Sequence, residues 1–392
     1  MEFNILTIIY LIFFSVLVWR RFDYALFLFL VLLPSYVLRF QIGPLPTTLL
    51  ELQFALIFII GIVRFHQQIF NQLKHYFKKY FYFFLFLLLF ITASTISIFT
   101  SADITRALGE WKAFFIEPIL FFLLLLGLDK KYSKKLITAL LISGLLTSIL
   151  AIYQHFTGFM VPYAFWTNQS TYRVTAWYGF PNGVGLFLAP LFALAIYNIF
   201  KYKKINWQTT IAILFIPTSI LAIFFAKSTG ALIAVAGTIF LLLFFYKKTR
   251  IVTVFLTILA FVLLFSLPQL ASVKTELTMQ DRSGQIRLGI WRETLTFLKD
   301  HPIAGSGLAS YSLRIVPYHQ KVNGENIEIF HHPHNIFLTI WINTGILGLL
   351  AFLGILLNIF YTNIFKKKLT AQNYIVLVSL ISLLITGLVD SP

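Results

Sequence analysis

The chain has 392 residues, of which 59% are hydrophobic and only 11% are charged. Soluble domains are typically about 45–50% apolar and about 25% charged. The composition therefore excludes a soluble enzyme, a disordered chain and a coiled coil, and it indicates a polytopic membrane protein. Lysine and arginine outnumber the acidic residues by 31 to 14. In a membrane protein such an excess marks one side of the bilayer, so it does not predict a nucleic-acid partner. The absence of cysteine excludes disulfides and thiolate chemistry.

The sequence contains about twelve apolar runs that are long enough to span a bilayer as helices. The predicted fold is therefore an all-α polytopic membrane protein with about twelve transmembrane helices. The first run has no cleavage-site pattern, so we interpret it as a span. The runs lie at 3–19, 22–40, 47–64, 81–100, 112–128, 135–156, 181–200, 208–226, 229–246, 251–268, 335–361 and 371–389.

Basic residues alternate between rich and poor connections along the chain. Loops rich in lysine and arginine stay in the cytoplasm, so segments 157–180 and 269–333 are predicted to face outward. The orientation of residues 1–40 stays open, because they form either two spans or a re-entrant pair. The chain stops directly after a span at 387–392, which predicts a further helix beyond it. The basic-rich set is Arg20, Arg21, Arg64, Lys74, Lys78, Lys79, Lys130, Lys131, Lys134, Lys135, Lys201, Lys203, Lys204, Lys247, Lys248, Arg250, Lys366, Lys367 and Lys368.

The large predicted outer loop, 269–333, differs in kind from the rest of the chain. It holds six of the 14 acidic residues, and five of the eight histidines lie within 301–334. Most spans carry no ionisable residue at their centre, whereas an ion-coupled transporter places charges there. The pattern therefore favours a reaction or binding site at the outer membrane surface.

A helix is expected within this loop, capped by Ser283 and ending before His301-Pro302. Arg287 precedes Trp291 by four residues, so both side chains lie on one helix face. Arg287 is then either a salt-bridged surface arginine or a clamp for an anionic ligand, since a guanidinium presents a planar fork to phosphate oxygens.

The loop ends in His331-His332-Pro333-His334-Asn335, immediately before a long apolar run. Proline fits the first helical position, which would put His334 and Asn335 in the first turn. A helix N-terminus attracts phosphate and disfavours imidazolium, so a neutral His334 is a candidate general base. The alternatives are a capping histidine, and a metal site with His332 that lacks an evident carboxylate.

Two further outer patches carry polar groups. Arg173 precedes a helix start at Phe180-Pro181-Asn182-Gly183, where Asn182 either relaxes the helix start or contacts a substrate. Lys227 lies in a short turn between two spans, where it either extends to the membrane interface or reaches a bound anion.

With these residues the sequence resembles the O-antigen ligase and O-antigen polymerase superfamily of bacterial membrane glycan transferases. The resemblance covers about residues 170–392, so we divide the chain into N-terminal transmembrane helices, 1–170, and a ligase-like region, 171–392. The matching features, in chain order, are Arg173 with Phe180-Pro181-Asn182-Gly183, Ser228-Thr229-Gly230, Arg287 with Trp291, Pro302 with Gly305 and Gly307, His332-Pro333-His334-Asn335, Gly345 with Gly348-Leu349, and Gly387-Leu388-Val389-Asp390.

The resemblance implies a metal-independent glycosyltransferase without a cofactor in the bacterial cytoplasmic membrane. It implies transfer of a glycan from a polyprenyl-diphosphate carrier to a hydroxyl of a lipid, glycan or protein at the extracytoplasmic face. On this basis Arg287 is expected to bind diphosphate and His334 to act as the base, with His332 as second choice. Asn182, Trp291 and Asn335 are expected to line the substrate cavity.

This sequence departs from the family at one position. The family usually has Ser-Arg-Gly at the outer turn, whereas Thr229 stands here in place of the arginine. Lys227 or Arg173 is then the expected second phosphate-binding cation.

The alternative function is a transporter, a flippase or a binding protein for lipid-linked glycans. Such a protein would need polar residues along a path through the spans, and Glu117, Gln154 and His155 are the main candidates. A purely structural scaffold would leave the histidine cluster without an explanation.

Overall fold

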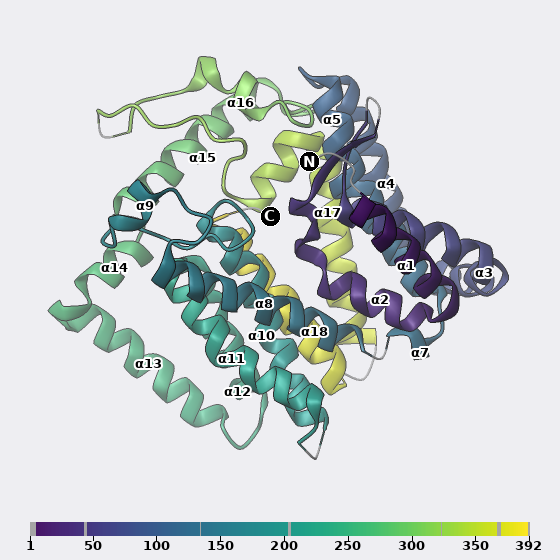
Figure 1. Ribbon diagram of the computed structural model, residues 1–392. Helices are drawn as coiled ribbons and strands as arrows, with labels where there is room; N and C mark the ends of the chain where they lie inside the picture. The colour runs from purple at the N-terminus through teal and green to yellow at the C-terminus, as the bar shows by residue number, and fades with distance from the viewer. Residues whose placement is uncertain are drawn as a thin grey trace.

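The structure is a computed structural model that describes residues 5–42, 45–133, 135–202, 205–322, 324–366 and 370–390. Most of these residues are helical, and the only strands among them form one short hairpin (Figure 1). The first half consists of α1 (Ile5–Arg20), α2 (Phe22–Val31), η1 (Leu33–Val37), β1 (Arg39–Ile42), β2 (Leu45–Thr48), α3 (Leu49–Lys79), α4 (Phe81–Phe99), α5 (Ile104–Glu110), η2 (Trp111–Ile116), α6 (Glu117–Gly127), α7 (Lys130–Ser133) and α8 (Leu136–Thr157).

The second half contains the long helices that surround the candidate site. It consists of α9 (Tyr163–Thr167), α10 (Pro181–Lys201), α11 (Trp207–Phe225), α12 (Thr229–Phe245), α13 (Arg250–Ser266), η3 (Pro268–Leu270), α14 (Ala271–Leu277), α15 (Arg282–Asp300), α16 (Tyr311–Arg314), η4 (Val316–Tyr318), α17 (Ile336–Tyr361), η5 (Thr362–Lys366) and α18 (Ala371–Gly387).

The protein is a multi-pass membrane protein by the length and composition of its helices. Among the described residues, six helices are long and apolar enough to span a bilayer: α3, α4, α8, α10, α11 and α17. A seventh candidate is the pair formed by α13 and residues 268–300, which meet at 91°. The apolar helices α1, α2, α12 and α18 are shorter. Each predicted run thus contains a helix, and the count of about twelve spans stays a prediction.

The predicted span 22–40 is wrong at its C-terminal end. Helix α2 stops at Val31, and the chain turns through η1 into an antiparallel hairpin in which Arg39 pairs with Thr48. Pro34 explains the break, because proline disfavours the helical conformation of the preceding residue. The hairpin ends at Thr48, whose side chain and that of Glu51 form a capping box at the start of α3.

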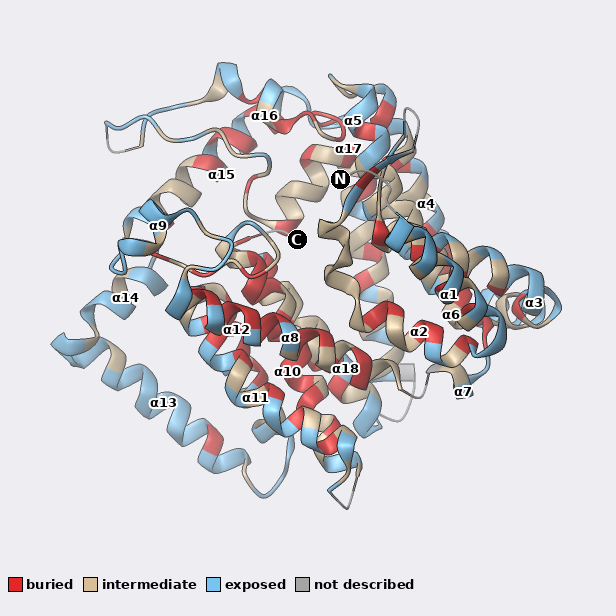
Figure 2. Ribbon diagram, in the orientation of Figure 1, coloured by how far each residue is buried: buried red, intermediate tan, exposed pale blue. Residues whose placement is uncertain are grey.

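Two apolar cores hold the bundle together, and Figure 2 shows buried residues concentrated in the helices around them. One core packs α8, α10, α11 and α12, and the other packs α1, α2, α3 and α6. Helix α13 is exposed along nearly its whole length, with Thr253 as its one buried residue. Exposed side chains such as Ile251 are apolar, so this surface suits lipid contact.

The segment 267–335 covers the end of the bundle that the sequence predicts to face outward. Its glycine turn lies against the bend in α17, where Ser306 N–H donates to Ile342 O at 2.6 Å. Gly305 and Gly345 have φ of 64° and 69°, and a Cβ at either would collide with the opposing backbone. These two glycines therefore let the loop pack directly on α17.

Five of the basic residues used to predict the orientation fall outside the described residues. They are Lys134, Lys203, Lys204, Lys367 and Lys368.

Candidate active site

Helix α15 begins two residues earlier than the sequence suggested. Asp281, and not Ser283, caps it, accepting hydrogen bonds from the backbone N–H groups of Ser283 and Gly284. A carboxylate at this position is favoured by the helix dipole as well as by the free N–H groups. The helix ends at Asp300, before His301-Pro302 as predicted.

Arg287 lies in the second turn of α15 and joins this helix to the end of α18. Its Nε donates to Val389 O at 2.8 Å, and its Nη1 donates to the hydroxyl of Ser283 at 2.9 Å. The guanidinium is thereby fixed in direction while it faces a cavity. This arrangement supports the clamp interpretation over that of a surface ion pair.

Arg173 reaches the same cavity from the segment before α10. Its Nε donates to Ala226 O at 2.8 Å, and its Nη2 donates to Asn182 Oδ1 at 2.6 Å. Burial lowers the pKa of the Arg173 guanidinium, and the positive charge of Arg287 lowers it further. The carboxylates of Asp390 and Glu276 raise it in return. The two guanidinium groups thus offer an anion positive charge and hydrogen-bond donors in a cavity whose lining also holds carboxylates.

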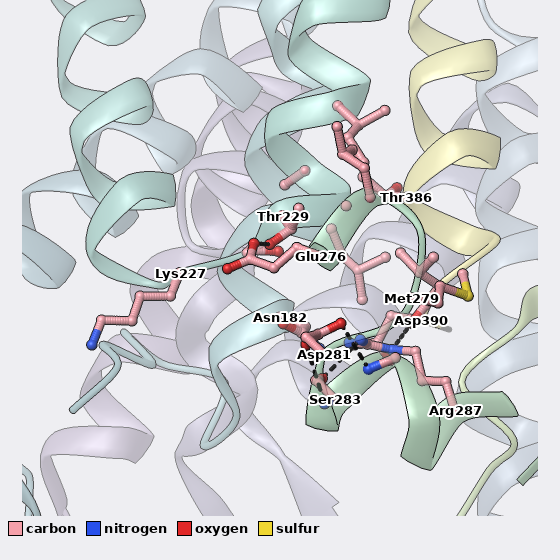
Figure 3. Close-up of a pocket in the computed structure, with 18 of the residues that line it drawn as sticks. Asn182, Lys227, Thr229, Glu276, Met279, Asp281, Ser283, Arg287, Thr386 and Asp390 are labelled. Atoms are coloured by element: carbon pink, nitrogen blue, oxygen red, sulfur yellow. Dashed lines mark hydrogen bonds between the residues drawn. The ribbon is translucent and has the colours of Figure 1, made fainter. Parts of the chain in front are cut away.

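The cavity has a volume of about 230 Å³. It is smaller than the range of about 300–1,000 Å³ found for drug-sized ligands, so it suits a compact charged group. Figure 3 shows Arg287, Asp281, Asn182 and Asp390 close together in it. The lining is Arg173, Asn182, Leu186, Lys227, Ser228, Thr229, Gly230, Ala231, Ile233, Glu276, Leu277, Met279, Asp281, Ser283, Gly284, Arg287, Thr386, Val389 and Asp390.

Lys227 contributes backbone to this lining, but its ammonium group is directed elsewhere. Its Nζ donates to Ser170 O at 2.7 Å, and Figure 3 shows the side chain pointing away from Arg287. At the family's arginine position, the hydroxyl of Thr229 donates to Glu276 at 2.8 Å. Of the two replacements expected from the sequence, the geometry favours Arg173 over Lys227.

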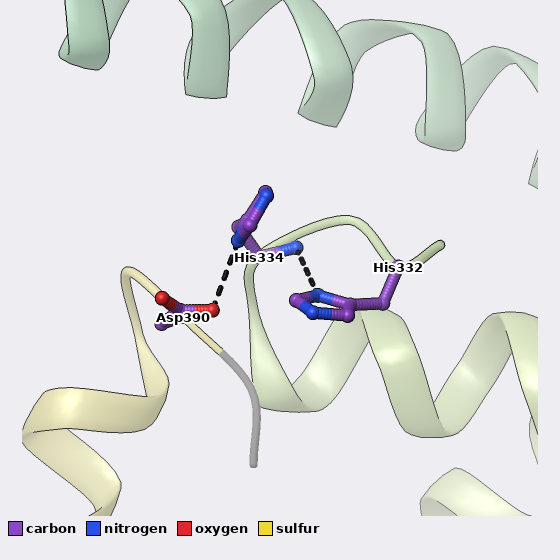
Figure 4. Close-up of side chains that lie close together, drawn as sticks. All are labelled: His332, His334 and Asp390. Carbon is purple, nitrogen blue, oxygen red and sulfur yellow. Dashed lines mark hydrogen bonds and ion pairs between the residues drawn. The ribbon is translucent and has the colours of Figure 1, made fainter. Parts of the chain in front are cut away.

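His334 forms a close pair with Asp390, the residue three positions beyond the end of α18 (Figure 4). The distance between His334 Nδ1 and Asp390 Oδ1 is 2.9 Å, and the Asp390 side chain is only 4% exposed. An ionised Asp390 only accepts hydrogen bonds, and in that state the proton of the pair lies on His334 Nδ1. The lone pair of Nε2 then remains for another partner.

The predicted start of the last long helix needs correction. Pro333, His334 and Asn335 precede α17, which begins at Ile336 and is capped by Asn335 through the N–H groups of Phe337 and Leu338. His334 adopts φ of 50°, a left-handed conformation that costs a non-glycine residue energy. Such strain persists where the surroundings hold it, which is common at functional sites.

Neighbouring residues position the histidine segment. His332 Nδ1 accepts from the N–H of His334 at 3.2 Å, and Trp291 Nε1 donates to Pro333 O at 2.9 Å. Asn335 Nδ2 donates to Leu388 O at 3.0 Å. Trp291 and Asn335 therefore support the histidine segment. The sequence had suggested that both line the substrate cavity, and neither is in the lining of the cavity beside Arg287.

Burial lowers the pKa of His332 to about 4, with the nearby His334 as the next cause. His332 is thus neutral at pH 7. A group with so low a pKa is a weak proton acceptor, which ranks it below His334 as a base.

The sequence analysis assigned no catalytic or binding role to Asp390. It supplies the carboxylate that the two histidines lacked, since one ligand atom from each of His332, His334 and Asp390 lies within 4.8 Å of the others. The same three groups thus have the donor types of a zinc site. The sequence carried two signals: an acidic residue directly after an apolar run, and its place in Gly387-Leu388-Val389-Asp390, one of the features that resemble the family.

The resemblance to known proteins is confirmed over part of the chain. Residues 212–353 match the family model described as O-antigen ligase. This match contains Arg287, Trp291, His332 and His334, whereas Arg173 and Asp390 lie outside it. A search of curated protein sequences finds no significant match.

Proposed function

We propose that this protein is a membrane glycosyltransferase that moves a glycan from a polyprenyl-diphosphate carrier to an acceptor hydroxyl. One observation carries the proposal. Arg173 and Arg287 converge on a single cavity, and the wall of that cavity includes Asp390, the hydrogen-bond partner of His334. A site for a diphosphate leaving group thus adjoins a site for a base.

The two arginines bind the diphosphate of the donor. In the transition state the bond between the anomeric carbon and the diphosphate oxygen breaks, and negative charge develops on that oxygen. Because carbonyl oxygens already fix both guanidinium groups, little reorganisation is needed as the charge forms. Preorganised donors of this kind are a major source of catalysis. We propose that they supply the positive charge without a metal ion.

His334 activates the acceptor. Its Nε2 takes the proton from the acceptor hydroxyl, and the oxygen attacks the anomeric carbon from the side opposite the diphosphate, with inversion. The carboxylate of Asp390 holds the Nδ1–H tautomer and stabilises the imidazolium that forms. His332, Trp291 and Asn335 keep the histidine segment in place.

The membrane setting follows from the same assignment. The polyprenyl chain of the donor lies in the bilayer, and its diphosphate enters the cavity at the outer end of the bundle. We place the protein in the bacterial cytoplasmic membrane with this site on the extracytoplasmic side. The acceptor is a lipid, a glycan repeat or a protein hydroxyl.

The test is release of free polyprenyl diphosphate in proteoliposomes supplied with glycan-loaded polyprenyl diphosphate and envelope extract. The intact protein should release it, with or without EDTA, and His334→Ala and Arg287→Ala should not. Lys299→Ala, an exposed change on the same helix as Arg287, is the matched control. Turnover by both site variants would refute the site. Glycan crossing to the opposite leaflet without release would indicate a flippase, and loss in EDTA would refute metal independence.

A further inference from the structure

A second cavity lies at the same end of the bundle and has no role in the mechanism above. Its volume is about 550 Å³, within the range typical of small-molecule sites. It is lined by residues of η1, the hairpin of β1 and β2, α3, α5 and η2, and by Ala309, Ser312 and His331. The charged and titratable groups in its lining are Tyr36, Arg39, Glu51, Arg106, Glu110, Lys112 and His331.

The histidine segment connects this second cavity to the first. His331 lines the second cavity. The next residue, His332, accepts a hydrogen bond from the N–H of His334, and His334 in turn binds Asp390 in the wall of the first cavity. The candidate base therefore lies on a short segment with the donor cavity at one end and the second cavity at the other.

The second cavity holds both cations and carboxylates, and both of its carboxylates are fixed by their contacts. Glu51 binds Lys112 at 3.0 Å and also accepts from the backbone N–H of Thr48 at 3.1 Å. Glu110 accepts from the N–H of Ala309 at 2.9 Å. Ala309 has φ of 54°, so the surrounding structure holds a strained residue in this wall.

This mixture of groups favours one class of ligand. The second cavity also has more than twice the volume of the first, so it has room for a ligand larger than a phosphate group. A sugar hydroxyl donates one hydrogen bond and accepts others, so a polyhydroxylated ligand can use fixed cations and fixed carboxylates together.

We infer that the second cavity binds the carbohydrate part of the acceptor and so places its hydroxyl at His334. This inference rests on the proposed transferase function, and it commits the acceptor to a glycan or the sugar headgroup of a glycolipid.

Gly109 provides a way to close this cavity without touching the first. It lines the second cavity, and a Cβ at this position meets nothing within 4 Å. Gly109→Trp should therefore fold and fill the space, whereas Gly109→Ala, the matched control, leaves it open.

The first measurement compares these variants in the proteoliposome assay with titrated envelope extract. Gly109→Trp should raise the apparent KM for the extract at least tenfold, and Gly109→Ala should change it less than twofold. Binding of glycan-free undecaprenyl diphosphate should be unchanged in both variants and weakened in Arg287→Ala. An unchanged KM in Gly109→Trp would overturn the inference. It would also be overturned if Gly109→Trp lost as much undecaprenyl diphosphate binding as its KM for the extract rises.

The second measurement does not depend on turnover. A photoreactive benzoylphenylalanine at position 109, irradiated in cells, should form adducts that release sugars on acid hydrolysis, and the same group at position 299 should not. Sugar adducts from a protein that transfers nothing would retain the cavity assignment and reject the proposed function. Adducts with protein or lipid alone, or none, would overturn the assignment.

Discussion

Replacing Asp390 by asparagine is the sharpest test of how His334 works. The substitution keeps the size of the side chain and one hydrogen-bonding oxygen, so the segment after α18 should stay in place. It removes the charge that stabilises the imidazolium. Stabilisation of the imidazolium matters only once His334 has taken a proton, so its loss should lower kcat. Binding of undecaprenyl diphosphate should not weaken, because the substitution removes a negative charge from the lining of the diphosphate cavity.

The geometry sets the size of the effect. At the 2.9 Å separation of His334 Nδ1 and Asp390 Oδ1, opposite unit charges attract by about 6 kcal/mol at an effective dielectric constant of about 20. This value is an upper limit, because the amide of asparagine retains part of the attraction through its dipole. A loss of about 3–4 kcal/mol corresponds to a fall in kcat of about 10²- to 10³-fold.

The assay is the release of polyprenyl diphosphate at saturating donor and extract. Asp300→Asn is the matched control, because Asp300 also accepts a hydrogen bond, from the hydroxyl of Tyr318, but lies on the exposed end of α15. Its kcat should match that of the unchanged protein. If Asp390→Asn stays within threefold of the unchanged kcat, the pairing of Asp390 with His334 has no role in proton transfer and the reasoning fails.

Three further predictions concern the groups around this pair. Arg287→Lys should weaken undecaprenyl diphosphate binding at least tenfold, because an ammonium group cannot keep both present contacts and a bidentate grip on phosphate; equal binding would refute the clamp. Trp291→Phe removes the hydrogen bond to Pro333 O, a loss of about 1 kcal/mol, and should lower kcat several-fold at constant donor affinity. The folded-state pKa of His332 is lowered to about 4, so the unfolded chain binds more protons between about pH 6.5 and pH 4. Stability should be full above about pH 6.5 and fall by at most about 3 kcal/mol down to pH 4. Thermal unfolding of His332→Gln should lose most of this pH dependence, and an unchanged profile would contradict the burial argument.

Local signals predicted those parts of the site that depend on neighbouring residues. The end of α15 before His301-Pro302 follows from the restriction that proline places on the residue before it. The position of Arg287 relative to Trp291 follows from the period of a helix. The start of α17 was misplaced only slightly, because Asn335 caps the helix in preference to entering it.

The remaining features depend on contacts between distant segments. Asp390 and His334 are 56 residues apart, and no helical period relates them. The chain alone also could not show that the ammonium group of Lys227 binds Ser170 O, which takes it away from the cavity. The hairpin of β1 and β2 fell at the junction of the predicted runs 22–40 and 47–64, and it supplies a wall of the second cavity.

The positions of Gln154 and His155 argue against the transport alternative. A flippase needs polar groups that face a path through the spans. Gln154 instead binds the backbone of the segment before α10, accepting from Ala176 N–H at 2.8 Å and donating to Ala176 O at 3.2 Å. The His155 ring stacks on Phe225 at a centroid distance of 3.7 Å. Two of the three candidate path residues therefore serve packing. By contrast, Arg173 and Arg287 line a cavity that also includes Asp390, the partner of His334, and this grouping supports the transferase proposal.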